Sequence, residues 1–227
     1  MQKAVHFLSR FSNLAWELLS PSHCLICRKI PEKAFCDDCW NAQKKLPQGS
    51  CDRCGIGEME NCEFCRWMRE LDYLRSAYDY DGVAGAAVRI FKYERQMALA
   101  PFLRETIRAL TLEVPEFDII VPVPIHWSRR TERGFNQAEL LCEGISELVD
   151  MNLLERVRPT PHQARMKGKE RVMKLRGSFR AKPCTGKRVV IVDDIVTSGG
   201  TLEACAEALR EAGARWVGGI TYARELP

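Results

Sequence analysis

The sequence has no long apolar run, no internal repeat and no low-complexity tail, and each absence removes a class of protein. No segment is long enough to span a bilayer. Polar residues between His6 and Glu17 interrupt the apolar spacing near the start, which does not resemble a secretory signal. We expect a cytoplasmic protein whose residues 1–19 form a helix packed on its own body. Contact of this helix with the inner face of the membrane is the alternative.

A nucleotide-binding loop of the type Gly-x-x-x-x-Gly-Lys-Ser/Thr is also absent, which argues against an ATPase. The formal net charge of +4 is too small to indicate a nucleic-acid-binding protein by itself. The charge is unevenly distributed, however. Residues 158–182 carry nine Lys and Arg residues and one acidic residue, whereas residues 1–71 carry ten Lys and Arg residues and nine acidic residues. If single-stranded DNA binds, we expect it on the cations of this basic segment, namely Arg158, Arg165, Lys167, Lys169, Arg171 and Lys174.

Eight of the eleven cysteines form four Cys-x-x-Cys pairs, a spacing that lets two thiolates converge on one metal ion. The pairs are Cys24/Cys27, Cys36/Cys39, Cys51/Cys54 and Cys62/Cys65. Eight sulfur ligands suffice for two tetrahedral zinc sites, and the absence of a water-activating base beside them predicts structural zinc. A disulfide framework is the alternative, and it suits secreted proteins. Sequential pairing and a cross-brace both remain open, although the short loops of 8 and 7 residues favour sequential pairing.

The most informative pattern is a buried strand followed by two carboxylates and a loop of small residues. Val189 to Val192 are all β-branched, as expected of a strand covered on both faces. Asp193 and Asp194 follow, and adjacent carboxylates there are costly unless they bind something. The loop, which starts a predicted helix, consists of Thr197, Ser198, Gly199, Gly200 and Thr201. Its backbone N–H groups and the helix dipole suit a phosphate, and the aspartates suit vicinal hydroxyls or a metal, so the pattern matches a phosphorylated ribose.

This run resembles the phosphoribosyl-pyrophosphate (PRPP) motif of type I phosphoribosyltransferases. The resemblance implies that Asp193 and Asp194 are the catalytic pair that holds the ribose hydroxyls, and that residues 197–201 hold the 5′-phosphate. It also implies Mg²⁺ bound with PRPP, and a pyrophosphate loop after a strand at Asp118–Val123. The cations predicted to meet the pyrophosphate are Arg129, Arg130, Arg133 and Lys92.

Three of these four cations have a simpler interpretation. Arg129 and Arg130 also fit an exposed charge pair before a helix. Lys92 also fits the surface of an amphipathic helix. The sequence from Gly134 to Gln137 also fits a helix start, with Phe135 in the core and Asn136 as a cap. Trp40, Trp67 and Trp127 are expected to pack rather than to stack on bases.

The chain as a whole resembles the ComF/GntX family, which is associated with DNA uptake and use in bacteria. The resemblance rests on the cysteine pairs, Ile90-Phe91-Lys92-Tyr93, Val121-Pro122-Val123-Pro124, Arg130, Arg133-Gly134-Phe135-Asn136-Gln137, Thr160, Gln163 and the PRPP motif. Lys174 departs from the asparagine usual in the family. The resemblance implies a phosphoribosyltransferase with an unidentified acceptor. One alternative is a competence factor that uses the site to bind PRPP or single-stranded DNA without catalysis, and another is a zinc adaptor. A DNA-uptake helicase is an implied partner.

Strand and helix patterns alternate along the chain, which predicts an α/β fold with a parallel sheet flanked by helices. We expect strands at 74–80, 118–123, 154–157, 189–192 and 216–222, and helices at 83–95, 98–111, 135–149 and 201–212. The polar segment 159–178 predicts a mobile loop that closes over the site. Residues 1–70 are predicted to be an N-terminal helix and a double zinc-knuckle module, and residues 71–227 a type I phosphoribosyltransferase-like domain.

Overall fold

The computed structural model of the chain describes residues 23–30, 33–58, 62–63, 65, 68–158 and 175–226. The helix predicted over residues 1–19, Trp67 and most of the loop predicted over 159–178 lie outside the described residues. The same holds for five cations of the basic segment, Arg165, Lys167, Lys169, Arg171 and Lys174.

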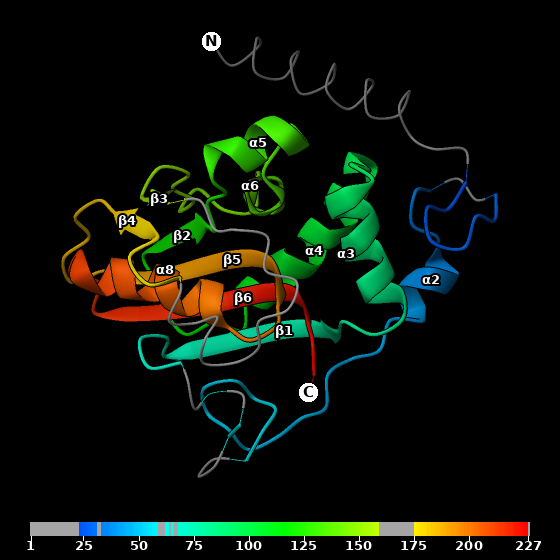
Figure 1. Cartoon of the computed structure of the whole chain (residues 1–227). Coiled ribbons are helices and arrows are strands. Elements are labelled where there is room, and N and C mark those ends of the chain that lie inside the picture. Colours follow the sequence, from blue (N-terminus) through cyan, green and yellow to red (C-terminus); the bar gives the residue numbers. More distant parts are fainter. Residues whose placement is uncertain are drawn as a thin grey trace.

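A parallel sheet of four strands forms the centre of the protein, in the order β1-β6-β5-β2 (Figure 1). The strands are β1 (Tyr73–Asp79), β2 (Ile119–Pro122), β5 (Arg188–Val196) and β6 (Trp216–Arg224). β5 and β6 are rich in β-branched and small residues and are buried almost throughout. A strand covered on both faces needs such a sequence. The predicted parallel sheet is confirmed.

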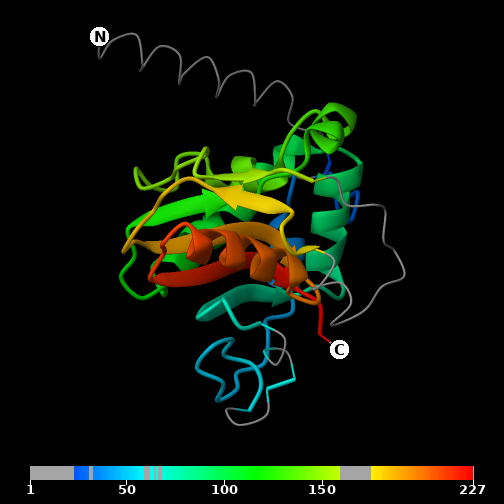
Figure 2. The ribbon, with the colours of Figure 1, turned by 60° about the vertical axis from the view of Figure 1, so that its left-hand side comes forward.

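Helices cover both faces of this sheet (Figures 1 and 2). Val190 and Val192 of β5 face a core shared with α3 (Val83–Tyr93) and α4 (Ala100–Thr111), which follows the 3-10 turn η1 (Met97–Leu99). Val189 and Ile191 face a second core with α8 (Gly200–Glu211). Pro101 lies in the first turn of α4, where a proline costs no internal hydrogen bond.

The aspartate pair does not follow a strand end as predicted, because β5 continues to Val196. The reason is β6, which runs on to Arg224 and pairs with Asp193, Ile195 and Val196. β2 stops earlier, at Pro122, where the proline nitrogen cannot donate a hydrogen bond to the ladder. The last residues of β5 therefore extend past β2.

The helix predicted over residues 135–149 is also wrong in its extent. Within this range the chain forms the short helix α6 (Gln137–Cys142), and a separate short helix, α5 (Trp127–Arg133), precedes it. Gly134, with φ +85°, ends α5 in the left-handed conformation that glycine tolerates. α6 ends at Cys142, because the next residue, Glu143, has a non-helical ψ of 117°, and Gly144 follows with φ +67°.

A second, two-stranded sheet pairs segments that are distant in sequence (Figure 2). β3 (Leu154–Arg156) runs antiparallel to β4 (Phe179–Ala181), which lies beside α8. The strand predicted at 154–157 is confirmed, whereas β4 was not predicted. Three residues give too short a pattern to distinguish a strand from a loop.

The cysteines form two groups on opposite faces of the main sheet. The first cysteine cluster, Cys24, Cys27, Cys36 and Cys39, includes the N-cap and one residue of the short helix α2 (Asp37–Asn41) and packs on the side of α3 and α4. The second cysteine cluster, Cys51, Cys54, Cys62 and Cys65, belongs to the core on the side of α8. The chain between them crosses the open edge of β1, where Lys45 bridges Tyr78. Covering an edge strand in this way blocks pairing with other chains. The predicted domain boundary at residue 70 stays a prediction.

Candidate functional site

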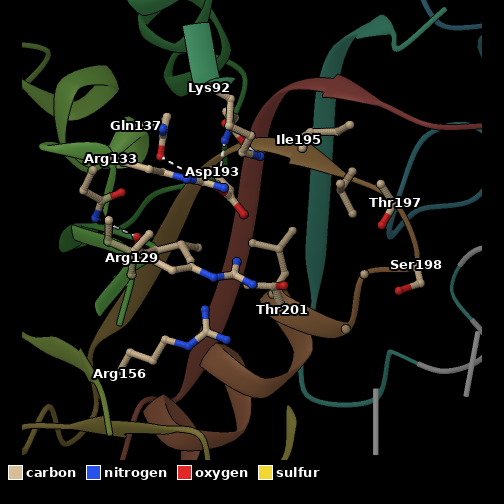
Figure 3. A pocket seen from close by; sticks show the side chains of 18 of the residues that line it. Lys92, Arg129, Arg133, Gln137, Arg156, Asp193, Ile195, Thr197, Ser198 and Thr201 are labelled. Atoms are coloured by element: carbon tan, nitrogen blue, oxygen red, sulfur yellow. Dashed lines mark hydrogen bonds and ion pairs between the residues drawn. The ribbon is translucent and has the colours of Figure 1, made fainter. Parts of the chain in front are cut away.

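A pocket of about 190 Å³ lies where β5 extends past β2 (Figure 3). It is lined by β5, by the loop that leads into α8, and by residues of α3, β3, α5 and the start of α6. Ten predicted site residues meet there, namely Lys92, Arg129, Arg133, Asp193, Asp194, Thr197, Ser198, Gly199, Gly200 and Thr201. Residues more than 100 positions apart thus converge on one cavity.

Asp193 and Asp194 occupy the β5 side of the pocket in two different environments. Burial raises the pKa of the Asp193 carboxyl to about 7, and the neighbouring Asp194 carboxylate adds to the shift. Asp194 is 1% exposed, and its Oδ1 accepts a hydrogen bond from Lys92 Nζ at 2.8 Å. Its Oδ2 is buried and accepts no hydrogen bond from the described residues. An unsatisfied buried oxygen is costly, which makes it a place where a ligand can donate a hydrogen bond.

Lys92 reaches Asp194 from the last turn of α3. Burial disfavours its ammonium, but the carboxylates of Asp194 and Asp193 outweigh burial and raise the pKa of Lys92. The simpler interpretation of Lys92 as a surface residue is therefore wrong, since its side chain is only 19% exposed. Lys92 already pairs with the Asp194 carboxylate, so any contact of Lys92 with pyrophosphate would be made in addition to this ion pair.

The loop of residues 197–201 opens α8 with backbone N–H groups directed out of the helix start. Gly199 is the N-cap, with φ +76°, and no side chain of the described residues caps the helix there. The first N–H groups of a helix have no partner within the helix and carry its positive dipole end. An anion in the pocket can therefore meet backbone donors here, as the sequence predicted.

Three guanidinium groups line the pocket, and the sequence interpretation found two of them. Arg133 donates to Gln137 Oε1 at 3.3 Å and lies 5.5 Å from the ring centroid of Tyr93. Arg129 lies near Arg156, and Figure 3 shows both guanidinium groups on the Thr201 side of the pocket. Burial lowers the pKa of Arg156, and the charge of Arg129 contributes. Arg156 was missed because it comes from β3, which carries no motif.

Arg130 lies outside the pocket lining, in contrast to its neighbour Arg129. Its Nη1 lies 2.8 Å from Glu139 Oε1, and its side chain is 57% exposed. One turn of helix α5 separates Arg129 and Arg133, which places them on one face and Arg130 on another. The pairing with Glu139 fits the simpler interpretation of Arg130 as a surface charge.

The sequence Arg133-Gly134-Phe135-Asn136-Gln137 builds the wall of the pocket between α5 and α6. Asn136 caps α6, since its Oδ1 accepts from Ala138 N at 3.1 Å, and its Nδ2 donates to Val123 O at 3.0 Å. This ties α6 to the end of β2. Phe135 packs on Phe91, with ring centroids 5.8 Å apart. The predicted helix start is confirmed, and Gln137, buried in the same wall, lines the pocket.

The expectation for the tryptophans is confirmed for Trp40 and wrong for Trp127. Trp40 packs edge-on against Phe35, with ring centroids 5.5 Å apart. Trp127 begins α5 and is 72% exposed. Because Arg129 follows two residues later and lines the pocket, this aromatic surface lies on the helix that borders the site.

The two cysteine clusters have the ligands and spacing of tetrahedral zinc sites. Within each cluster the four sulfur atoms lie within 4.8 Å of one another. Cys27 and Cys36 sulfurs are 3.7 Å apart, and those of Cys51 and Cys65 are 3.9 Å apart. Zinc–sulfur bonds of about 2.3 Å in a tetrahedron separate sulfurs by roughly 3.8 Å. Each cluster can therefore bind one zinc ion, and the ligands group sequentially rather than as a cross-brace.

Comparison with known proteins identifies the class. A family described as "Phosphoribosyl transferase domain" matches residues 166–225, which include Asp193, Asp194 and the 197–201 loop. DNA utilization protein YhgH of Salmonella typhimurium is 31% identical over 225 residues, which cover 88% of this chain and 96% of that protein. Competence protein F of Haemophilus influenzae is 29% identical over 213 residues, and the match covers 84% of this chain and 91% of that protein. Competence protein ComFC of Bacillus subtilis is 25% identical over 200 residues, and the match covers 81% of this chain and 80% of that protein.

The fold and these similarities define a phosphoribosyltransferase-like protein with cysteine clusters that can hold zinc. More narrowly, the chain belongs to the ComF family. Within the described residues, every helix is too short or too polar to cross a lipid bilayer.

Proposed function

We propose that the protein binds PRPP in the pocket at the end of β5 and transfers its phosphoribosyl group to an acceptor. The observation that carries this proposal is the meeting of two carboxylates, an uncapped helix start and three guanidinium groups in one cavity. PRPP presents a ribose diol, a 5′-phosphate and a pyrophosphate, which need those three kinds of partner in turn.

The carboxylates hold the sugar. Asp194 Oδ2 is buried without a hydrogen bond from the described residues, so it suits a ribose hydroxyl as donor. The ion pair with Lys92 holds the Asp194 side chain in place. The N–H groups at the start of α8 bind the 5′-phosphate. Positioning of this kind contributes much of the rate in a displacement reaction.

The leaving group departs towards the cations. The bond between the anomeric carbon and the pyrophosphate oxygen breaks, pyrophosphate leaves with the electron pair, and the acceptor supplies the new bond and loses a proton. In this proposal Arg133 and Arg129, which line the same pocket, neutralise the pyrophosphate, and Arg156 adds positive charge beside Arg129. The carboxylate oxygens of Asp193 and Asp194 fit a hard cation such as Mg²⁺. Bound Mg²⁺ would add positive charge to the departing pyrophosphate.

The test is a screen for release of pyrophosphate from PRPP with nucleobase, amine and DNA acceptors. The variant Asp193→Asn/Asp194→Asn should lose all transfer. Asp37→Asn/Asp38→Asn is a matched control, because these adjacent aspartates lie on the surface in α2 and outside the pocket. Transfer that survives in the first variant would contradict the proposal, as would absence of pyrophosphate release with every acceptor class.

A second candidate function is binding of single-stranded DNA beside this pocket, without transfer. The observation that favours it is Trp127, an exposed aromatic ring on the same helix as Arg129. Exposed aromatics next to cations are typical of single-strand binding. Weaker binding of oligonucleotides by Trp127→Ala, with unchanged PRPP binding, would support this function. We further propose that the protein works in the cytoplasm with other competence proteins, such as a DNA-uptake helicase.

A further inference from the structure

The second cysteine cluster lies against the loop that opens α8. Met68 follows Cys65 by three residues and is 1% exposed. A Cβ placed on Gly199 would lie 2.6 Å from Met68 Sδ and 3.2 Å from Met68 Cγ. The thioether therefore fills the space beneath Gly199, and the loop backbone rests directly on it. Gly199 is required here twice over, by this contact and by its φ of +76°.

A second contact joins the same segment to α8. Glu203, in the first turn of α8, is 5% exposed. Its Oε1 accepts from Arg69 N at 2.6 Å and from Glu70 N at 3.0 Å. Hydrogen bonds from backbone N–H groups to a buried carboxylate are strong. They fix the start of α8 to the residues that directly follow Met68.

The cysteine cluster in turn fixes Met68. Arg53 lies between the ligands Cys51 and Cys54, and its guanidinium donates to Cys65 O at 3.3 Å and also to Met68 O. A zinc ion bound by the second cysteine cluster would fix both the turn that contains Arg53 and Cys65, which lies three residues before Met68. Small metal modules have little core of their own, so loss of the metal loosens the segment.

We propose that Met68 and Glu203 are positioning residues, through which the zinc-bound second cysteine cluster holds the 197–201 loop in shape for the phosphate of PRPP. The first cysteine cluster packs on the opposite face of the sheet, so its metal has no such link among the described residues. The two clusters, alike in ligands, would then differ in effect: removing the second loosens the phosphate site, and removing the first does not.

The experiment that does not depend on ligand binding is hydrogen exchange of the peptide spanning residues 197–205 in the full-length, ligand-free protein. Met68→Ala keeps all eight ligands but removes the support, and should speed exchange roughly tenfold through local opening. Cys62→Ser should do the same, and Cys36→Ser should not. Glu203→Ala should act like Met68→Ala, whereas Glu203→Gln keeps an acceptor oxygen and should restore protection. Glu207→Ala, one turn further along α8, is the matched control.

The second measurement is the dissociation constant of PRPP with Mg²⁺, together with the zinc content. It rests on the proposed function. Met68→Ala should bind PRPP roughly tenfold more weakly with both zinc ions retained, and Met68→Leu should recover most of the affinity. Unchanged exchange in Met68→Ala and Cys62→Ser, or equal acceleration in Cys36→Ser, would overturn the inference. If the wild type binds no PRPP, the proposed function fails, and the exchange data still decide this inference.

Discussion

Lys92 Nζ lies 2.8 Å from Asp194 Oδ1, which makes an ion pair between α3 and β5 with side chains only 19% and 1% exposed. The pair lines the pocket, and Lys92 gives the buried carboxylate a counter-charge. Two elements that flank the site are therefore linked through its most buried carboxylate. An apolar replacement for Lys92 leaves Asp194 without this cation.

We expect Lys92→Met to lower the free energy of unfolding by about 3 kcal/mol, because removing one partner strands a buried charge. Urea unfolding of the ligand-free protein measures this. Lys92→Met/Asp194→Asn should recover much of the loss, since no charge is then stranded. Arg130→Met is the matched control, because Arg130 and Glu139 form an exposed pair that should contribute under about 1 kcal/mol. Equal losses for both single variants would contradict a special role of the buried pair.

The raised pKa of Asp193, about 7, predicts how stability depends on pH. Its ordinary value is 3.8, so between these values the folded state binds more protons than the unfolded state. Stability contributed by protonated Asp193 is therefore lost as the pH rises towards 7 and above. Asp193→Asn has no such loss. The melting temperature of this variant relative to that of the wild type should therefore increase from pH 5 to pH 8 and stay constant at higher pH.

Thermal unfolding without PRPP or Mg²⁺ checks this difference, which at pH 8 should reach at least about 2 °C for a chain of this size. Asp37→Asn, on the surface, serves as the control and should show a constant difference. A constant difference for Asp193→Asn as well would mean that the pKa of Asp193 is ordinary.

We expect about two zinc ions per chain, one in each cysteine cluster. Cys36→Ser and Cys62→Ser should each lose about one, because the two sets of ligands lie on opposite faces of the sheet. Metal analysis of the purified protein gives the count. Wild-type protein with little zinc and reactive thiols would show that the clusters do not hold metal, and loss of both ions in either single variant would show that they are not independent.

Single-stranded DNA, if it binds, should contact the basic segment. Neutralising its six cations, Arg158, Arg165, Lys167, Lys169, Arg171 and Lys174, should weaken binding and flatten its dependence on salt. Fluorescence anisotropy of a labelled oligonucleotide at several salt concentrations measures both. A second set of four exposed cations outside the basic segment, Lys29, Lys33, Lys44 and Lys45, should have little effect when neutralised. Binding that depends on this second set would contradict the prediction.

The sequence predicted the residues of the pocket better than the shape of the chain around them. Asp193, Asp194 and the 197–201 loop are adjacent in sequence, so one local pattern contains both the ligand chemistry and the strand and helix that carry it. The extent of β5 was misjudged because it depends on β6, a partner 20 residues or more away. Arg156 was missed for the same reason, since only the pairing of β3 with β4 brings it to the pocket.

The cysteine spacing predicted the composition of the metal sites but gave no information on where they lie. Cys-x-x-Cys pairs are local, and the structure groups them sequentially. The two clusters lie on opposite faces of the sheet because the chain between them crosses the edge of β1 near Lys45. This crossing depends on tertiary packing. The contact between Met68 and Gly199 is of the same kind, since 131 positions separate the two residues.

Calorimetric titration of the protein with PRPP and Mg²⁺ tests the central claim most directly, because it needs no knowledge of the acceptor. Binding with about one site per chain is expected for the wild type and for Asp37→Asn/Asp38→Asn. For Asp193→Asn/Asp194→Asn, which should keep its zinc and its fold, binding should weaken at least roughly a hundredfold, as expected when charged hydrogen bonds to a ligand are lost. No heat of binding in the wild type, or equal affinity in the two double variants, would contradict the assignment of this pocket to PRPP.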